Sequence, residues 1–258
     1  MILTDAAGIE HAPAADGFRI VSLVPSITEL LFDLGLGDRM VGRTAFCVHP
    51  KDRIKQVRSV GGTKTVNFDK LRAAAATHVI VNIDETPRAL AEELAAEGLR
   101  VVVTHPVEVA DNLDLYRLMG NLFDRQQAAD TLCGRLQAAL DDVAGEAWPN
   151  RRAAYVIWKD PWMTVSRDTY ISRMLALVGI DTGDWPGDDR YPQLDLSEET
   201  LAALDLVLLA SEPFPFKPSH LAEIGSDKAR MIDGEMVSWY GSRAILGVDY
   251  LRRFADAL

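Results

Sequence analysis

The sequence has few of the features that define several large classes of protein. Only two cysteines, Cys47 and Cys133, occur in 258 residues. Two are too few for a disulfide framework, and their spacing leaves their redox state open. No apolar run is long enough to cross a bilayer. The first eighteen residues carry Asp5, Glu10 and Asp16 in place of a basic start and an apolar centre, so we expect no export signal in them.

Positive charge and catalytic motifs are also scarce. The chain has 27 basic and 38 acidic residues and a formal net charge of -11. This balance argues against a general nucleic-acid binder, which needs a basic surface to neutralise phosphates. The sequence has no phosphate-binding glycine-rich loop, no Gly-x-Ser-x-Gly turn and no zinc-protease helix. We therefore expect a protein that is not an enzyme and that has no nucleic-acid partner.

One long helical pattern lies between Asp124 and Ala147. Its apolar residues recur every three or four positions, which is typical of an amphipathic helix: Leu132, Leu136, Ala139, Leu140 and Val143. Asp124 and Gln127 have the spacing of a capping box, and Gly145 marks the end. A helix of this length spans roughly 33 Å, enough to connect two lobes.

Strands and helices alternate on both sides of this helix. On the amino side the pattern predicts strands over 19–24, 40–42, 79–83 and 100–104. It predicts helices over 69–76 and 88–97, and a further helix that starts at Ser26, because Ser26 and Glu29 have the spacing of a capping box. On the carboxyl side it predicts strands over 153–158 and 230–232, helices over 168–178 and 245–257, and a loop over 181–192. Such alternation is typical of an α/β fold with parallel sheets.

The two halves also contain a pseudo-repeat. Residues 201–212 parallel residues 71–85, because each segment is a short helix followed by a buried strand that ends near a glutamate, Glu212 or Glu85. The sequence therefore predicts an N-terminal lobe over 1–123, a linking helix over 124–147 and a C-terminal lobe over 148–258.

Several motifs, in order and spacing, resemble those of one family. They are Arg-Ile-Val-Ser-Leu-Val-Pro-Ser-Ile-Thr-Glu-Leu-Leu at 19–31, Gly-Gly-Thr-Lys at 61–64, Asn82 and Glu85 after a strand, the turn 158–161, Arg-Tyr-Pro at 190–192 and the segment 233–240. Together they resemble the helical-backbone, or class III, substrate-binding proteins of ABC importers, in particular the vitamin B12-binding branch.

The resemblance implies two Rossmann-like lobes, each with a central parallel sheet, joined by a single long helix. It also implies a monomer outside the cytoplasm that holds cobalamin, haem, a ferric siderophore or a metal ion between its lobes and delivers it to permease subunits. No cofactor is required, since the metal chelate is the bound ligand. The absence of an export signal from the first eighteen residues has two explanations. Either a signal has been removed and replaced by a start methionine, or the protein is a cytoplasmic ligand-binding homologue without a transporter.

Aromatic residues gather where the predicted strands end. In open parallel sheets, ligands bind outside the carboxyl ends of the strands. The aromatic residues in or beside those loops are Phe46, Trp158, Trp162, Tyr191, Phe214, Phe216, Trp239 and Tyr240. They suit a flat, largely apolar ligand. The alternative is that several of them only fill the undersides of loops.

Polar candidates in the same loops have two interpretations each. Ser26 either caps its helix or contacts ligand, Glu85 and Glu212 either cap turns or face the ligand, and Lys64 and Arg243 either meet anionic groups or are ordinary surface charges. His49 is a possible axial ligand of a bound cobalt or iron. A receptor for a bare transition-metal ion is the alternative function. It would require His49, His105 and acidic residues to converge on one point, with Cys47 as a further metal-compatible side chain. No tightly spaced metal motif is present.

Two acidic residues occupy matching places in the pseudo-repeat. Asp69 and Glu199 each stand at the start of an equivalent helix, where the helix dipole favours a carboxylate. The resemblance adds a second interpretation, since the vitamin B12-binding branch carries one exposed acidic residue per lobe at these positions to meet arginines of the permease. We therefore predict that Asp69 and Glu199 dock a transporter.

Overall fold

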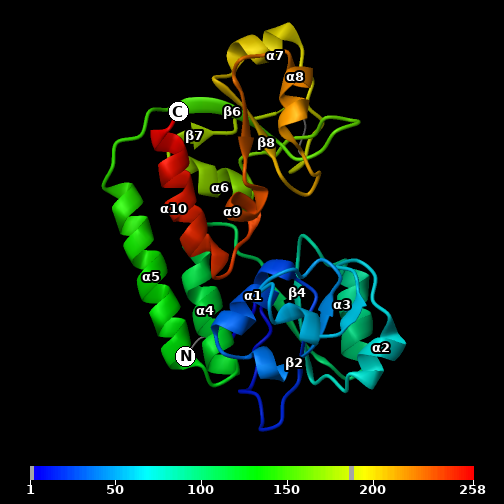
Figure 1. Cartoon of the computed structure of the whole chain (residues 1–258). Helices are drawn as coiled ribbons and strands as arrows, with labels where there is room; N and C mark the ends of the chain where they lie inside the picture. The colour runs from blue at the N-terminus through cyan, green and yellow to red at the C-terminus, as the bar shows by residue number, and fades with distance from the viewer. Residues whose placement is uncertain (1–2, 186–188) are drawn as a thin grey trace. The chain divides into compact units, whose positions relative to one another are not determined.

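The computed structural model describes residues 3–185 and 189–258, which form two compact units (Figure 1). Unit 1 comprises the described residues up to Pro106, together with Ala110–Leu136 and Tyr240–Arg243. Unit 2 comprises Val107–Val109, the described residues of Gln137–Trp239 and Ala244–Leu258. Each unit therefore includes a short segment from the other half of the chain.

Unit 1 contains a five-stranded parallel sheet. Its strands are β1 (Ile20–Ser22), β2 (Met40–Thr44), β3 (Ser59–Gly61), β4 (His78–Asn82) and β5 (Arg100–Thr104). Their order in the sheet is β3-β2-β1-β4-β5, and every pairing is parallel. The chain therefore builds outward from β1 in one direction and then from β4 in the other. This change of direction is a topological switch point of the kind at which α/β proteins bind ligands.

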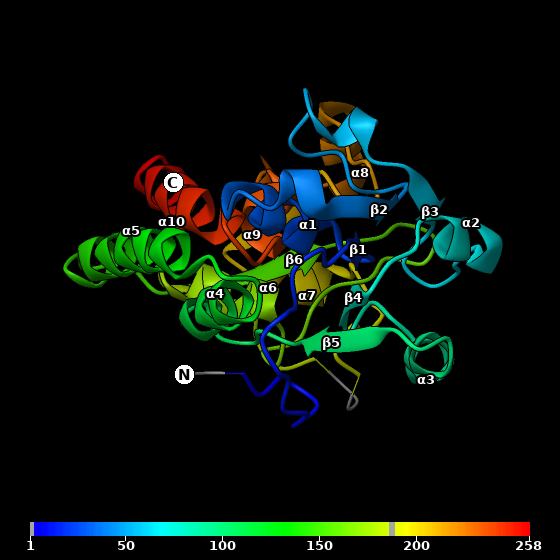
Figure 2. The ribbon, with the colours of Figure 1, turned by 90° about the horizontal axis from the view of Figure 1, so that it is seen from below.

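Helices cover both faces of this sheet. They are α1 (Pro25–Asp33), α2 (Phe68–Ala73), α3 (Arg88–Ala96) and α4 (Asp111–Leu122), with short 3-10 helices η1 (Gly37–Arg39) and η2 (Ile54–Gln56). Figure 2 shows α2 and α3 on one side and α1 and α4 on the other. Leu71 of α2 and Leu94 of α3 pack with Val79 of β4 in one buried cluster.

Unit 2 contains a four-stranded parallel sheet. Its strands are β6 (Arg151–Val156), β7 (Ile180–Asp181), β8 (Leu206–Ala210) and β9 (Ala229–Ile232), in the order β7-β6-β8-β9. All three pairings are parallel. The switch point of this sheet lies between β6 and β8. The predicted fold class, α/β with a parallel sheet in each of two units, is confirmed.

Short helices surround the second sheet. They are α6 (Tyr170–Ala176), α7 (Glu198–Ala203), η3 (Pro218–His220), α8 (Leu221–Ile224), α9 (Gly234–Ser238) and the longer α10 (Arg243–Asp256). Leu201 of α7 and Ile224 of α8 pack on the face of the sheet that carries Val207 and Leu209. Helix α9 contacts α6.

The long predicted helix is present as α5 (Gln126–Ala144), and its residues belong to both units. Leu132, Leu136 and Val143 are buried as predicted, and Asp141 is exposed. The predicted cap is wrong, because Asp124 has a φ of 54° and precedes the first helical residue by two positions. An N-cap residue needs an extended backbone, so Asp124 ends the turn after α4 instead.

The start of α1 also differs from the prediction. The N-cap residue is Val24, which makes no side-chain cap, and Pro25 occupies the first turn. Proline is favoured at this place because its missing N–H would have had no partner there. Ser26 therefore lies inside the helix, and the capping-box interpretation of Ser26 with Glu29 is wrong. Glu29 instead accepts two hydrogen bonds from the guanidinium of Arg243, at 2.8 and 2.7 Å.

The segment before β1 covers the open edge of β5. Ala6 donates its N–H to the carbonyl of Val103, and Val103 donates its N–H to the Asp5 carboxylate, both at 3.0 Å. The same carboxylate accepts from the N–H groups of Ala7 and Ile9 and lies 2.9 Å from Nε2 of His11. The edge groups of Val103 are thus paired, which removes a template for association with other strands. None of the helices among the described residues is long and apolar enough to cross a membrane.

Candidate functional site

The candidate site consists of the loops at the carboxyl ends of the strands, considered in each unit separately. In unit 1, the switch point is bordered by the start of α1 after β1 and by residues 83–86 after β4. In unit 2 it is bordered by residues 157–163 after β6 and 211–216 after β8. The topology therefore brings Ser26 near the loop of Glu85, and Trp158 near the loop of Glu212.

Glu85 binds an aromatic side chain from a distant part of the sequence. The hydroxyl of Tyr240 donates to Oε1 of Glu85 at 2.6 Å. Burial raises the pKa of Tyr240 well above its usual value, and the neighbouring Glu85 carboxylate raises it further. The phenol therefore stays neutral and acts as the donor. This bond favours a structural role for Glu85 over a ligand contact.

Arg243 is held in a similar way. Its side chain is 7% exposed and that of Glu29 is 15% exposed. Their two parallel hydrogen bonds form a bidentate pair, a geometry that fixes both side chains. Because this contact satisfies much of its charge, the structural interpretation of Arg243 is also favoured. Ser26 is buried, whereas Lys64 is exposed on the turn after β3.

Large apolar side chains are exposed at the same edge of unit 1. Phe46 is 63% exposed, Ile83 49% and Val48 43%. Phe46 and Val48 follow β2, and Ile83 follows β4, so they flank the end of β1 on its two sides. Half-buried His49 belongs to the same loop as Phe46. Exposed side chains of this size and grouping are typical of a binding surface.

Glu212 holds an aromatic residue within unit 2. Nε1 of Trp239 donates to Oε1 of Glu212 at 2.6 Å, and the hydroxyl of Ser238 donates to the same oxygen at 2.9 Å. Burial raises the pKa of Glu212, against the opposing effect of these two hydrogen bonds. Trp239 is 8% exposed. The geometry favours a structural role for Trp239 and Glu212.

Four aromatic residues of unit 2 form a stack. The rings of Trp162 and Phe216 are parallel with centroids 5.9 Å apart, Phe214 lies 4.6 Å from Phe216, and Trp158 meets Phe214 edge-on at 5.6 Å. Phe216 is buried and the inner three pack against the core. Trp158, at the outer end, is 42% exposed. The inner rings therefore support Trp158 as the surface that can meet a ligand.

Tyr191 adds a second exposed ring to unit 2. It is 40% exposed and lies in a loop that runs beside residues 162–166, where the N–H of Ser166 donates to the carbonyl of Arg190. The guanidinium of Arg190 lies 5.9 Å from the centre of the Tyr191 ring. Five of the eight exposed large apolar side chains in the described residues thus belong to strand-end loops or to loops paired with them.

The predicted metal ligands have other contacts. In the part of the chain that the structure describes, no group of three or more His, Cys, Asp or Glu side chains could hold a metal ion. Cys47 is buried between the hydroxyls of Thr28 and Thr44, at 3.1 and 3.2 Å, and burial raises the pKa of its thiol. A thiol is a weaker ligand than a thiolate. His105 lies 3.5 Å from Asp84.

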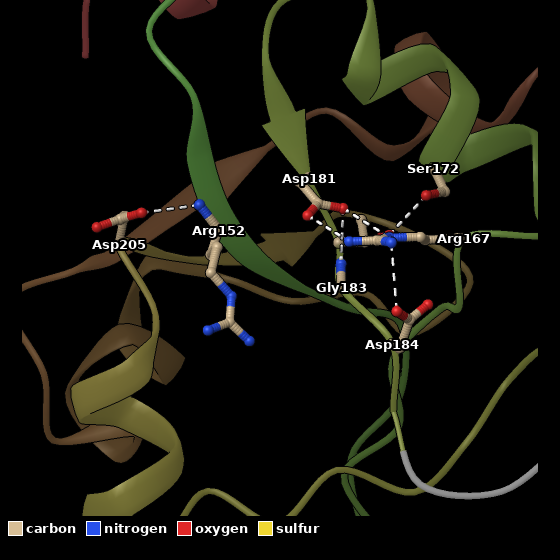
Figure 3. A network of polar contacts seen from close by, with 8 residues as sticks. Arg152, Arg167, Ser172, Asp181, Gly183, Asp184 and Asp205 are labelled. Atoms are coloured by element: carbon tan, nitrogen blue, oxygen red, sulfur yellow. Dashed lines mark hydrogen bonds and ion pairs between the residues drawn. The ribbon is translucent and has the colours of Figure 1, made fainter.

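A second polar cluster lies in unit 2 away from these loops. Arg167 donates to both oxygens of Asp181, at 3.0 and 2.7 Å, and lies 3.2 Å from Asp184 (Figure 3). The hydrogen bond from Arg167 lowers the pKa of Asp181. Ser172 and Thr182 share a hydrogen bond of 2.6 Å beside this pair. The cluster fixes Asp181 and Asp184, whose carboxylates are both paired with Arg167. Residues 186–188 of the predicted loop over 181–192 lie outside the described residues.

The predicted docking residues occupy equivalent places in the two units. The side chain of Asn67 caps α2 and that of Ser197 caps α7, so Asp69 and Glu199 are each the second residue of a capped helix. Both are exposed. They differ in one respect, because Asp69 lies 3.2 Å from Arg72.

Sequence reasoning missed Val48 and Ile83 as candidate contact residues. Ile83 could have been noticed, because it directly follows the buried residues of β4. An isoleucine at that position is equally compatible with one more buried residue of the strand, so the sequence alone does not show that it is exposed. The hydrogen bonds of Tyr240 and Trp239 could not be predicted from a local sequence pattern, because 155 and 27 positions separate these residues from their glutamates.

Comparison with known proteins agrees with this arrangement. A family model described as "Periplasmic binding protein" matches residues 20–212, more than half of the chain. An uncharacterised ABC transporter substrate-binding lipoprotein of Bacillus subtilis is 24% identical over 248 residues, which cover 90% of this chain and 78% of the relative. A vitamin B12-binding protein of Yersinia pestis is 26% identical over 191 residues, 72% of this chain and 66% of the relative, just under two thirds of its length.

A solved structure shows the same fold. The periplasmic vitamin B12 binding protein of Vibrio cholerae superposes with a TM-score of 0.80 at 16% sequence identity. The superposition covers 93% of this chain and 96% of that protein. At this identity the likeness concerns the fold alone, and it includes both parallel sheets.

Proposed function

The chain belongs to the family of periplasmic binding proteins, and we propose that it binds cobalamin or a similar flat metal chelate, such as haem or a ferric siderophore, for delivery to an ABC importer. The family consists of binding proteins and not of enzymes, which agrees with the prediction from the missing catalytic motifs. The similar lipoprotein of Bacillus subtilis is named as the substrate-binding component of an ABC transporter. The relative from Yersinia pestis is named for vitamin B12.

One observation supports this proposal most strongly: exposed aromatic and aliphatic side chains lie at the carboxyl ends of both sheets. Phe46 and Ile83 in unit 1, and Trp158 and Tyr191 in unit 2, are each at least 40% exposed. An aromatic side chain buries some 150 to 250 Å² when it is covered. A large ligand with an apolar face would cover such side chains, whereas a bare ion would leave them in water.

The polar candidates support the same class of ligand. The carboxylates of Glu85 and Glu212 are already bonded to Tyr240 and Trp239, so we do not assign them to the ligand. Lys64 and His49 are the proposed polar contacts, with Lys64 suited to a carboxylate or phosphate group of the chelate and His49 to a bound cobalt or iron. A bare transition-metal receptor has less support, because the described residues bring no metal-binding group together.

The experiment is a titration of the purified chain with cyanocobalamin, haemin and a ferric catecholate siderophore, measured by calorimetry and by tryptophan fluorescence. Binding of one chelate with quenching of Trp158 is expected. Trp158→Ala and Phe46→Ala should each weaken that binding by about 1 to 3 kcal/mol. Zinc and ferric ions alone are included to test the bare-metal alternative.

A matched control separates a binding surface from exposure in general. Leu246 on α10 is 45% exposed, close to the 42% of Trp158, but it is not in a strand-end loop. Leu246→Ala should leave affinity unchanged. Equal affinity in the Trp158, Phe46 and Leu246 variants would move the site away from the strand ends, and binding of zinc alone would favour the alternative function.

We further propose that Asp69 and Glu199 meet the permease. Both are exposed and stand in the first turn of a side-chain-capped helix, one in each unit. A pair of equivalent acidic residues suits a partner with two similar subunits. This role requires a location on the outer side of the cytoplasmic membrane, which fractionation of the producing cells would test.

A further inference from the structure

The chain returns from unit 2 to unit 1 at a single peptide bond. Trp239 is the last residue of one stretch of unit 2, and Tyr240 is the first of four residues that belong to unit 1. We call residues 238–243 the return segment. Its consecutive aromatic residues are both buried, at 8% exposure each.

Each of these aromatic residues is bonded to a glutamate of its own unit. Trp239 donates to Glu212, which follows β8, and Tyr240 donates to Glu85, which follows β4; both bonds are 2.6 Å long. The two glutamates occupy equivalent places in the pseudo-repeat. Hydrogen bonds to a carboxylate are about twice as strong as those between neutral groups, so both side chains are firmly held.

The residue after Tyr240 is fixed as well. The N–H of Gly241 donates to Oδ1 of Asn112 at 2.6 Å, and its carbonyl accepts from the hydroxyl of Tyr116 at 2.8 Å. Gly241 has a φ of 79°, and a Cβ there would lie 3.1 Å from the carbonyl oxygen of Ser26. Glycine is therefore required at this position. The return segment has no flexible stretch that could absorb a movement of Trp239.

We propose that Trp239 and Tyr240 couple the loop after β8 to the loop after β4, so that local opening of one loop loosens the other. Glu85 and Glu212 act in this coupling as positioning residues. A displacement of Glu212 moves Trp239, and because Gly241 is fixed, the displacement must be taken up at Tyr240. It then reaches Glu85.

The coupling concerns the loops that carry exposed apolar side chains. Ile83 lies two residues before Glu85, and Phe214, which supports Trp158, lies two residues after Glu212. Local opening of such loops is a low-energy event that amide exchange detects residue by residue. The inference goes beyond the proposed function and does not depend on the identity of the ligand.

Hydrogen exchange on the full chain without ligand tests the coupling. The amides of Ile83, Asp84 and Thr86 are hydrogen-bonded in unit 1, to Thr104 and Asn82, and they report on the loop after β4. Trp239→Phe removes the indole N–H donor in unit 2 and leaves a smaller ring in its place. We expect it to accelerate exchange at these three amides by about threefold or more.

The reverse experiment uses Tyr240→Phe, which removes only the phenol hydroxyl in unit 1. It should accelerate exchange at Ser211 and Phe214 of unit 2, whose amides donate to the carbonyls of Ile232 and Ile157. Glu212→Gln keeps an acceptor oxygen for Trp239, so it should preserve slow exchange at the amides of the loop after β4.

Asp181→Asn serves as the control for a weakened polar contact elsewhere in unit 2. It disturbs the pair with Arg167 and should change neither loop. Acceleration confined to the unit that carries the substitution, in both the Trp239 and the Tyr240 variants, would overturn the proposal. An equal effect of Asp181→Asn at Ile83 and Thr86 would also overturn it.

Discussion

His78 at the start of β4 provides a quantitative test of the packing in unit 1. Its side chain is buried beside Phe18 and Phe123, with ring centroids 6.4 and 5.3 Å away. The pKa of His78 is lowered from 6.5 to about 4, mainly by burial and to a smaller extent by the charges of Arg100 and His11. The imidazole is therefore neutral in the folded chain at neutral pH.

The sign of the pH effect follows from this depression. Between pH 6.5 and 4 the unfolded chain binds a proton at His78 that the folded chain does not, so stability falls as the pH falls. One pKa unit corresponds to 1.36 kcal/mol, so the loss attributable to His78 is about 2 kcal/mol at pH 5 and about 3 kcal/mol at pH 4.

His78→Phe removes this titration while keeping a ring of similar shape. Nε2 of His78 is buried without a hydrogen-bond partner among the described residues, so the substitution breaks no hydrogen bond of this atom. Nδ1 gives up a 2.8 Å bond with the hydroxyl of Thr77, which costs about 1 kcal/mol. The variant should therefore be less stable than the parent by about 1 kcal/mol at pH 7 and more stable than the parent by about 1 to 2 kcal/mol at pH 4 to 5.

Urea unfolding at constant ionic strength, repeated from pH 7 to pH 4, measures the difference. Ile80→Val is the control, because Ile80 is fully buried two residues further along β4 and carries no charge. It should lower stability by about 1 kcal/mol at every pH. If the His78→Phe curve runs parallel to that of the parent, as the Ile80→Val curve should, the assigned pKa and its cause are both refuted.

Three further predictions concern other sites. The Glu212→Gln variant should gain stability relative to the parent as the pH rises above 4.5. Burial raises the pKa of Glu212, so ionisation of this side chain opposes folding above that pH, and the variant has no such ionisation. Urea unfolding at several pH values measures the difference. Gly120→Val should destabilise by several kcal/mol in thermal unfolding, since a Cβ at Gly120 would lie 2.6 Å from that of Ala129. Asp69→Lys with Glu199→Lys should leave ligand affinity unchanged but abolish association with a cognate transporter in reconstituted vesicles, and retained association would contradict the docking role.

Much of the fold was accessible from the sequence because periodic burial is a local signal. The pattern of Leu132, Leu136 and Val143 predicted α5. The apolar runs predicted β4 and β5 to within one residue, and the pseudo-repeat predicted a strand within 201–212, where β8 lies. Helix α4 was not predicted, although buried Leu115, Leu118, Met119 and Leu122 have helical spacing. An interior glycine and several polar residues weaken that pattern, and the close approach of Gly120 to Ala129 explains why the glycine is there.

The misplaced caps have a different cause. In both cases the helix start was predicted from a side chain that suits a cap, but the backbone conformation places the start elsewhere. Pro25 occupies the first turn of α1, and the positive φ of Asp124 excludes it as an N-cap residue. Strands β3 and β7 were missed because they have only three and two residues. Strands that short are determined by pairing with neighbours and not by their own composition.

The pseudo-repeat explains why the candidate site was only partly predictable. Repetition in sequence placed Glu85 and Glu212 at equivalent strand ends, and topology then placed aromatic residues around them. Which of those aromatic residues face water depends on partners far away in sequence. Trp239 and Tyr240 are turned inward by the glutamates, whereas Phe46, Trp158 and Tyr191 are each at least 40% exposed. The glutamates thus divide the aromatic set into a buried part that positions the loops and an exposed part that can meet a ligand.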